Sequence, residues 1–169
     1  MPAVLDFAAL HQTRELLLSR GLAVLAAWAL CSIVGGGYGL ARAPRRAATF
    51  YFHAMTVGWG LVNAVMAFVG IVQQETVAPA GLQLADLFAA QLRNENLFGF
   101  NAGLDVAYVM TGFYLRARAA APGAAHPARL LGYGRALWVQ GGFLLVFDAA
   151  MWALMHAQGR AWLTMAGAH

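Results

Sequence analysis

The chain has 169 residues, of which 61% are hydrophobic and only 11% are charged, and its mean hydropathy is +0.61. A soluble domain carries about 25% charged residues, so this composition excludes an ordinary soluble protein and favours membrane helices. The formal charge is +4, but the arginines lie beside hydrophobic stretches and form no basic stripe, which argues against nucleic-acid binding.

Four hydrophobic stretches are long enough to cross a hydrocarbon core, which takes about 20 residues per helix. Pro44 and three arginines end the first stretch, and a linker rich in alanine and proline separates the last two. The sequence therefore predicts an all-α membrane protein, a four-helix bundle in one domain over residues 1–169. The predicted spans are 16–40, 49–72, 97–115 and 131–157.

The stretch between the second and third spans is too short and too polar to cross a membrane. In residues 82–94, four apolar side chains recur on one helical face: Leu84, Leu87, Phe88 and Leu92. This pattern predicts a short interfacial helix between the second and third spans. A plain surface helix and a lid over a pocket both fit the pattern.

The arginines orient the predicted spans. Seven lie in or beside the two linkers that join spans one to two and three to four: Arg42, Arg45, Arg46, Arg116, Arg118, Arg129 and Arg135. Four lie on the other side. The positive-inside rule therefore predicts a multi-pass protein of a bacterial inner membrane with both termini in the periplasm. A bacterial source is inferred from the use of arginine without lysine and the richness in alanine and glycine.

A weak internal repeat relates the two halves. The segment 37–43 (GYGLARA) ends span one much as 112–118 (GFYLRAR) ends span three, and Asn63-Ala-Val-Met resembles Asp148-Ala-Ala-Met. Two hairpins of the same orientation would be related by an axis along the membrane normal. Such matches also arise by chance in sequence rich in alanine and glycine, so duplication stays open.

Polar side chains from different spans fall at similar depths. Counted from the linkers at 1.5 Å per residue, Asp105 lies roughly 16 Å deep and Asp148 roughly 20 Å. Asn63 and Trp28 come to roughly 21 Å, and Asn101 to roughly 22 Å. An ionisable group inside a membrane helix is a functional candidate by default. We therefore expect a polar site near the membrane midplane.

The two aspartates are the centre of this expected site. No basic residue lies at their depth, and burial beside a like charge disfavours the ionised form. We expect at least one carboxyl group to be protonated at neutral pH and to donate to its partner or to Asn63. A polar clasp between hairpins and a proton-, cation- or ligand-binding pocket both fit this pair.

Other residues complete the prediction. Asn63, Asn101 and Gln140 would orient the aspartates or hydrogen bond between helices, and the pocket wall would be Trp28, Trp59, Tyr108 and Trp152. We predict no cofactor and no metal. The one cysteine builds no zinc site, and His53 and His156 lie too far apart, roughly 25–30 Å, to ligate one haem. No catalytic motif appears, so enzyme activity stays open.

Three segments carry a family resemblance: FHAMTVGWGLVN (52–63), FNAGLDVAY (100–108) and RLLGYGRALWVQGGFLLVFD (129–148). Together they resemble an uncharacterised family of small four-span bacterial integral membrane proteins. The resemblance implies a four-helix membrane domain and marks Asn101, Asp105, Gln140 and Asp148 as motif positions. It implies no activity.

Three functions fit these observations. The first is a midplane polar pocket that binds a small amphipathic or lipid-like molecule, together with a proton. The second is an accessory subunit of a larger membrane complex, with a purely structural aspartate pair. The third is a proton-coupled transporter that works as a homodimer. Membrane lipids are the expected partners in each case.

Overall fold

The computed structural model describes residues 7–74, 80–81 and 83–167, with side chains described up to residue 163. Within these ranges the chain is all-helical and contains no strand. The four helices are α1 (Phe7–Arg42), α2 (Ala48–Val72), α3 (Leu84–Ala120) and α4 (Pro127–Gly167). The predicted all-α fold with four main helices is confirmed.

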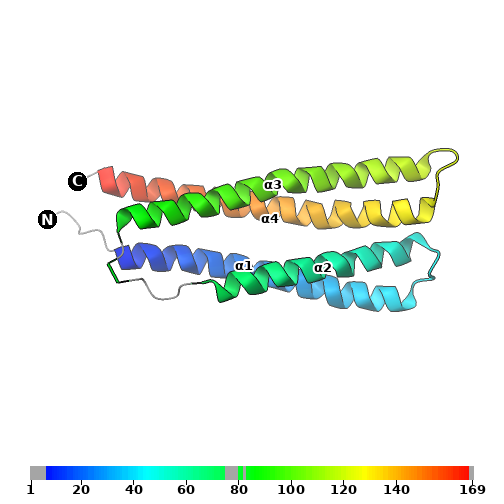
Figure 1. Cartoon of the computed structure of the whole chain (residues 1–169), viewed down its shortest axis with the longest axis horizontal. Coiled ribbons are helices and arrows are strands. Elements are labelled where there is room, and N and C mark those ends of the chain that lie inside the picture. The colour runs from blue at the N-terminus through cyan, green and yellow to red at the C-terminus, as the bar shows by residue number, and fades with distance from the viewer. Residues whose placement is uncertain (1–6, 75–79, 82, 168–169) are drawn as a thin grey trace.

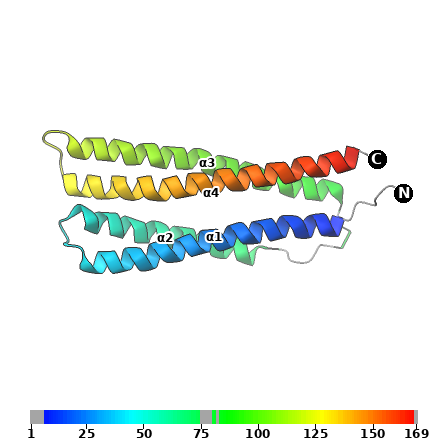
Figure 2. The same cartoon turned by 180° about the vertical axis from the view of Figure 1, so that it is seen from behind.

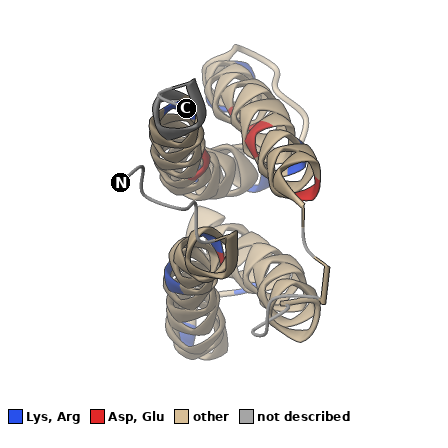
Figure 3. Cartoon of the chain, turned by 90° about the vertical axis from the view of Figure 1, so that its left-hand side faces the viewer, with Lys and Arg blue, Asp and Glu red and all other residues tan. Residues whose placement is uncertain are grey.

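The helices form two hairpins that lie side by side, α1 with α2 and α3 with α4 (Figures 1 and 2). The hairpin turns, residues 43–47 and 121–126, share one end of the molecule, which we call the loop end. The start of α1 and the end of α4 share the other, which we call the termini end. Viewed along the bundle, each hairpin is one pair of neighbouring helices (Figure 3).

Proline and glycine shape the two turns of the loop end. After α1, the N–H of Ala47 donates to the carbonyl of Pro44 at 2.8 Å, which closes a tight turn. In the second turn Gly123 has φ +74°, a left-handed conformation that glycine adopts without a steric penalty. Pro127 then starts α4, where its missing N–H leaves no hydrogen bond unmade.

The interfacial helix expected at 82–94 is not a separate element, because residues 84–94 form the first turns of α3. Gln83 and Asp86 form a capping box at its start, where the N–H of Gln83 donates to Oδ2 of Asp86 at 3.1 Å. No proline or glycine follows until Gly99, so nothing in the chain breaks the helix. The helix therefore continues through residues 94–96, between the predicted interfacial helix and the predicted third span.

Three of the four helices are long and apolar enough to cross a membrane, namely α1, α2 and α4. Among the described residues α3 does not reach that level of hydropathy, since Asn101 and Asp105 lie in its central part. A membrane protein is thus supported by composition, and the crossing by α3 stays a prediction. At 1.5 Å per residue α2 is about 38 Å long, whereas α1, α3 and α4 are about 54, 56 and 62 Å.

Glycines set the close approach within each hairpin. A Cβ added at Gly112 in α3 would lie 2.8 Å from the carbonyl oxygen of Gly134 in α4, and the reverse distance is also 2.8 Å. In the first hairpin, a Cβ on Gly60 would lie 3.0 Å from Cβ of Ser32. Glycine at these positions lets helix backbones meet.

The two hairpins touch each other mainly through α2 and α4, while α1 meets α3 and α4 at few places. At the loop end a Cβ on Gly132 of α4 would lie 2.4 Å from the carbonyl oxygen of Ala48 in α2. Within the described ranges, α2 and α3 make no backbone contact. Because these two helices are separated, the side chains between them do not fill all of the space.

Candidate functional site

The structure brings Asp105 and Asp148 together inside the α3–α4 hairpin. Both residues are almost fully buried, 3% and 5% exposed, and the two carboxyl groups lie near each other. The Asn101 side chain, one turn before Asp105 on α3, also lies within reach of Asp148. A hydrogen bond between two carboxyl groups needs a proton on one of them, because an ionised carboxylate only accepts.

Small residues allow this contact. A Cβ on Gly141 would lie 3.0 Å from Cβ of Tyr108, so α4 packs closely on α3 two turns from Asp148. Among the described residues neither aspartate forms an ion pair, and Oδ2 of Asp105 is buried without a hydrogen-bond partner. No group of three potential metal ligands occurs in the same part of the chain. The pair is thus a buried acidic site without a cation.

Gln140 lies apart from the aspartates, at the junction of α1 and α4. Its Oε1 accepts from the indole N–H of Trp28 at 2.8 Å, and its Nε2 donates to Oγ of Ser32 at 3.2 Å. The Trp28 ring also stacks on Phe143, with ring centroids 4.0 Å apart. Each polar atom of this buried amide makes one hydrogen bond to α1, so Gln140 links the two hairpins. Its predicted role in a ligand site stays a prediction.

Asn63 lies on α2, in the other hairpin from the aspartates. It is buried on the face of α2 that carries Thr56, Gly60 and Ala67, and Gly60 lies against Ser32 of α1. Its Nδ2 has no hydrogen-bond partner among the described residues, so it donates to neither carboxyl group. The expected hydrogen bond runs the other way, from a protonated carboxyl group to Oδ1 of Asn63, and it stays a prediction. The face of α2 that carries Asn63 packs on α1.

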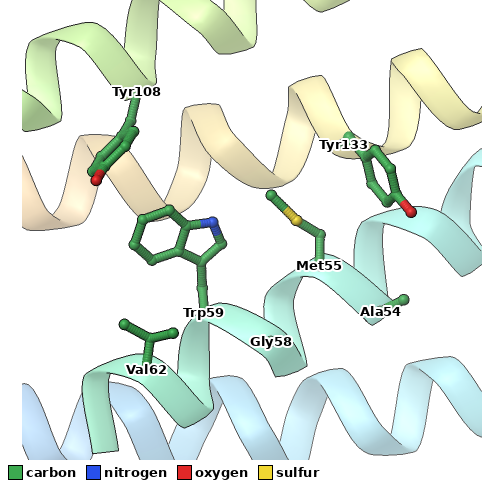
Figure 4. A pocket seen from close by; sticks show the side chains of 7 residues that line it. All are labelled: Ala54, Met55, Gly58, Trp59, Val62, Tyr108 and Tyr133. Carbon is green, nitrogen blue, oxygen red and sulfur yellow. The ribbon is translucent and has the colours of Figure 1, made fainter. Parts of the chain in front are cut away.

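A pocket of about 480 Å³ lies where α2 and α3 are apart (Figure 4). Trp59 and Tyr108 flank it, with ring centroids 4.8 Å apart in an edge-on contact that joins α2 to α3. The remaining lining is largely apolar and comes from α2 and α4: Ala54, Met55, Gly58, Val62 and Tyr133. We call this space the Trp59 pocket.

Two of the four predicted wall residues thus line the Trp59 pocket, and two do not. Trp28 is engaged by Gln140 and Phe143, as described above. Trp152 is 43% exposed and stacks on His156, with centroids 5.4 Å apart. The aspartates, Asn63, Asn101 and Gln140 are not among the lining residues. The polar site and the pocket, expected to coincide, are therefore separate features.

The sequence reading missed a polar cluster near the termini end of the α3–α4 hairpin. Gln91 is 1% exposed, and its Nε2 donates to the carbonyl of Met155 and, at 3.3 Å, to Oε1 of Glu95. Oε2 of Glu95 lies 3.1 Å from Nδ1 of His156. The spacing of Leu87, Gln91 and Glu95, which continues the stripe that leads to Asp105, was the signal that α3 extends this far.

One protein family matches the chain. The model of a family of unknown function, DUF6992, matches residues 24–149. This range covers both hairpins from before Trp28 to just after Asp148, and it includes the Trp59 pocket and the acidic pair. Comparisons with curated proteins and with solved structures find no match.

Proposed function

The chain belongs to the DUF6992 family of unknown function, and we propose that it is an integral membrane protein that binds one small amphipathic or lipid-like molecule. The Trp59 pocket carries this proposal. Its volume of about 480 Å³ falls within the roughly 300–1,000 Å³ of pockets that bind small molecules. A mostly apolar lining with a few polar groups is also typical of such sites.

The polar groups of the pocket indicate which part of a ligand they would meet. The indole nitrogen of Trp59 points along the pocket toward Met55 (Figure 4), and it has no hydrogen-bond partner within the described part of the chain. An N–H group can only donate, so it fits a ligand acceptor such as an ester carbonyl or a hydroxyl oxygen. The apolar lining of Met55, Val62 and Ala54 fits the body of the ligand.

The position of the pocket along α2 supports a ligand drawn from the membrane. Trp59 lies 11 residues after the first residue of α2, or about 16 Å along the helix, near the middle of a hydrocarbon core of about 30 Å. The pocket is open at the side of the bundle, between α2 and α3. A molecule dissolved in the bilayer could therefore enter laterally.

Filling the pocket tests the proposal without removing any existing contact. A Cβ on Gly58 would meet nothing within 4 Å, so Gly58→Phe projects a ring into open space. The matched control is Gly103→Phe on α3, which also meets nothing within 4 Å but does not line the pocket. Lipids and other small molecules that co-purify in mild detergent would be identified by mass spectrometry.

We expect one molecular species to co-purify at about one copy per protein with the wild type and with Gly103→Phe. With Gly58→Phe its occupancy should fall about tenfold, because the new ring occupies space that the ligand needs. A tenfold loss of affinity corresponds to about 1.4 kcal/mol of binding free energy. Equal occupancy in the two variants would contradict the proposal.

The acidic pair supports a second candidate function, proton-coupled transport by a dimer. The supporting observation is that Asp105 and Asp148 are adjacent, buried and without a cation partner among the described residues. Protein reconstituted in vesicles with a pH-sensitive dye should take up protons down a gradient. Asp105→Asn and Asp148→Asn should each abolish this uptake, and wild-type protein without uptake would exclude the function.

A further inference from the structure

A second pocket, of about 270 Å³, lies at the loop end where three helices meet. Its lining comes from the start of α2, the end of α3 and the start of α4: Ala48, Arg116, Ala119, Ala120, Pro127, Ala128 and Leu131. Arg116 is the only charged side chain of this lining, and the walls around it are small and apolar. We call this space the Arg116 pocket.

Packing holds the Arg116 side chain at this pocket. A Cβ on Gly134 would lie 2.9 Å from Cγ of Arg116, so the stem of the side chain lies directly on α4. The guanidinium group lies 5.6 Å from the ring centroid of Trp138, in a cation–π contact. A guanidinium fixed by its stem and by an aromatic ring keeps its N–H groups available for an anion.

No carboxylate neutralises the loop end. The sequence contains no Asp or Glu from residue 16 to 74 or from 106 to 147, and these ranges include the loop end and the Arg116 pocket. Six further arginines lie in or near the two turns of the loop end: Arg42, Arg45, Arg46, Arg118, Arg129 and Arg135. All six are exposed. The ion pairs of the described residues involve only Arg14 and His156, which lie toward the termini end.

We propose that the Arg116 pocket binds the phosphate headgroup of an anionic phospholipid. Guanidinium groups match the oxygens of a phosphate, and basic pockets between membrane helices bind such headgroups. The pocket is level with the first turn of α2, which is one of the helices apolar enough to cross a membrane. Its alanine and leucine walls suit the glycerol and the first acyl carbons, which a free phosphate ion lacks.

The helix starts add to this attraction. Both α2 and α4 begin at residues that line the pocket, Ala48 and Pro127. The cap residue Ala47 offers no side-chain hydrogen bond to the first N–H groups of α2. The positive ends of both helix dipoles therefore lie beside the same space as Arg116. The inference rests on insertion of α2 and α4 in a bilayer and is independent of the Trp59 pocket.

Native mass spectrometry of the detergent-solubilised full chain tests the proposal, with phosphatidylglycerol and phosphatidylcholine of identical acyl chains as probes. Wild-type protein should bind phosphatidylglycerol about fivefold to tenfold more tightly than phosphatidylcholine. Arg116→Gln should reduce this preference to about twofold or less. The matched control Arg118→Gln removes the same charge from the same helix, but Arg118 does not line the pocket, so the preference should remain.

A pocket-filling variant tests the proposal even if Arg116→Gln fails to fold. Ala128→Phe occupies the space and leaves every arginine in place, and it should also abolish the preference. Equal losses in Arg116→Gln and Arg118→Gln would overturn the proposal in favour of a diffuse surface charge. Displacement of the lipid by millimolar inorganic phosphate would overturn it in favour of a free-anion site. Gly58→Phe, which blocks the Trp59 pocket, should leave the preference unchanged.

Discussion

The two hairpins use the same packing device but fill their interiors with different chemistry. In the α1–α2 hairpin, helices meet at Gly36 and Gly60, and the buried polar groups at mid-length (Ser32, Thr56 and Asn63) are neutral. In the α3–α4 hairpin, they meet at Gly112 and Gly134, and the buried polar groups at mid-length include two acids, Asp105 and Asp148. Asn63 and Asp148 hold matching places in the weak repeat, and both are almost fully buried.

The difference in buried polar groups shows which of them the hairpin fold requires. The neutral amide of Asn63 occupies in α2 the repeat position that the carboxyl group of Asp148 occupies in α4, so the hairpin fold does not itself require an acid. An acid is also the costlier choice inside a membrane helix. The aspartate pair is therefore a better candidate for function than the neutral residues of the first hairpin, and substitutions in both hairpins can test this contrast.

The largest effect is expected from the glycine crossing of the second hairpin. In Gly112→Ala the new Cβ would lie 2.8 Å from the carbonyl oxygen of Gly134 and 2.9 Å from the backbone N of Trp138, so the helices must separate. We expect a loss of about 3 kcal/mol, at the upper end for overpacking. Gly36→Ala should lose less, because its nearest neighbour, at 3.0 Å, is the Val57 side chain.

Thermal unfolding in detergent, followed by circular dichroism, measures both changes. The control is Gly103→Ala on α3, which meets nothing within 4 Å and should be neutral or stabilising by about 0.5–1 kcal/mol. If Gly112→Ala unfolds at the same temperature as Gly103→Ala, the helices do not cross as closely at Gly112 and Gly134 as described.

Exchanging acid and amide between the hairpins should give the next largest effect. Asn63→Asp places a carboxyl group where the amide already lacks a partner for its Nδ2, and we expect a loss of about 1–3 kcal/mol. Asp148→Asn should lose about 1 kcal/mol or less, because an amide has nearly the size of a carboxyl group and can donate a hydrogen bond to Asp105. The same melting experiment compares them, and the reverse order would refute the contrast between the hairpins.

A smaller effect is expected where the hairpins are joined. Gln140→Leu leaves the Trp28 indole N–H and the Ser32 hydroxyl without their partner, at a cost of about 1–2 kcal/mol. Trp28→Phe keeps the stacking on Phe143 and loses only the N–H donor. A double-mutant cycle measures the coupling, and strictly additive losses would show that the hydrogen bond does not contribute.

The smallest effect is expected at the exposed end of the second hairpin. His156→Asn removes the ion pair with Glu95, but the His156 side chain is 47% exposed. Exposed pairs contribute little, so we expect a change of at most about 0.5 kcal/mol in the free energy of unfolding. A larger loss would mean that the buried hydrogen bonds of Gln91 with Glu95 and Met155 depend on His156.

The sequence predicted which aspartates lie at the same level along the bundle better than it predicted which neighbour each helix face contacts. Helical rise placed Asp105 and Asp148 at similar depths, and hydropathy located the helices and the turn at Pro44. Rise alone does not determine which neighbour a helix face meets. The face of α2 that carries Asn63 packs on α1, and Gln140 hydrogen bonds to Trp28 of α1.

The pocket and the length of α3 were beyond the sequence for related reasons. The Trp59 pocket exists because α2 and α3 do not approach each other, a property of the packing of all four helices. The continuity of α3 depends on tertiary contacts that override local polarity, such as that of Gln91 with the carbonyl of Met155. Hydropathy alone therefore divided one helix into two.

The unequal helix lengths have a consequence for the shape presented to the water phase. A hydrocarbon core is about 30 Å thick, and about 40–45 Å with its headgroups, whereas α1, α3 and α4 are about 54–62 Å long. Only α2 is close to the membrane thickness. If the loop end sits at one membrane face, three helices rise about 10–20 Å above the opposite headgroups as a rigid pillar. An antibody or protease could reach these protruding helix ends from one compartment alone, so their accessibility would report the orientation of the protein in the membrane.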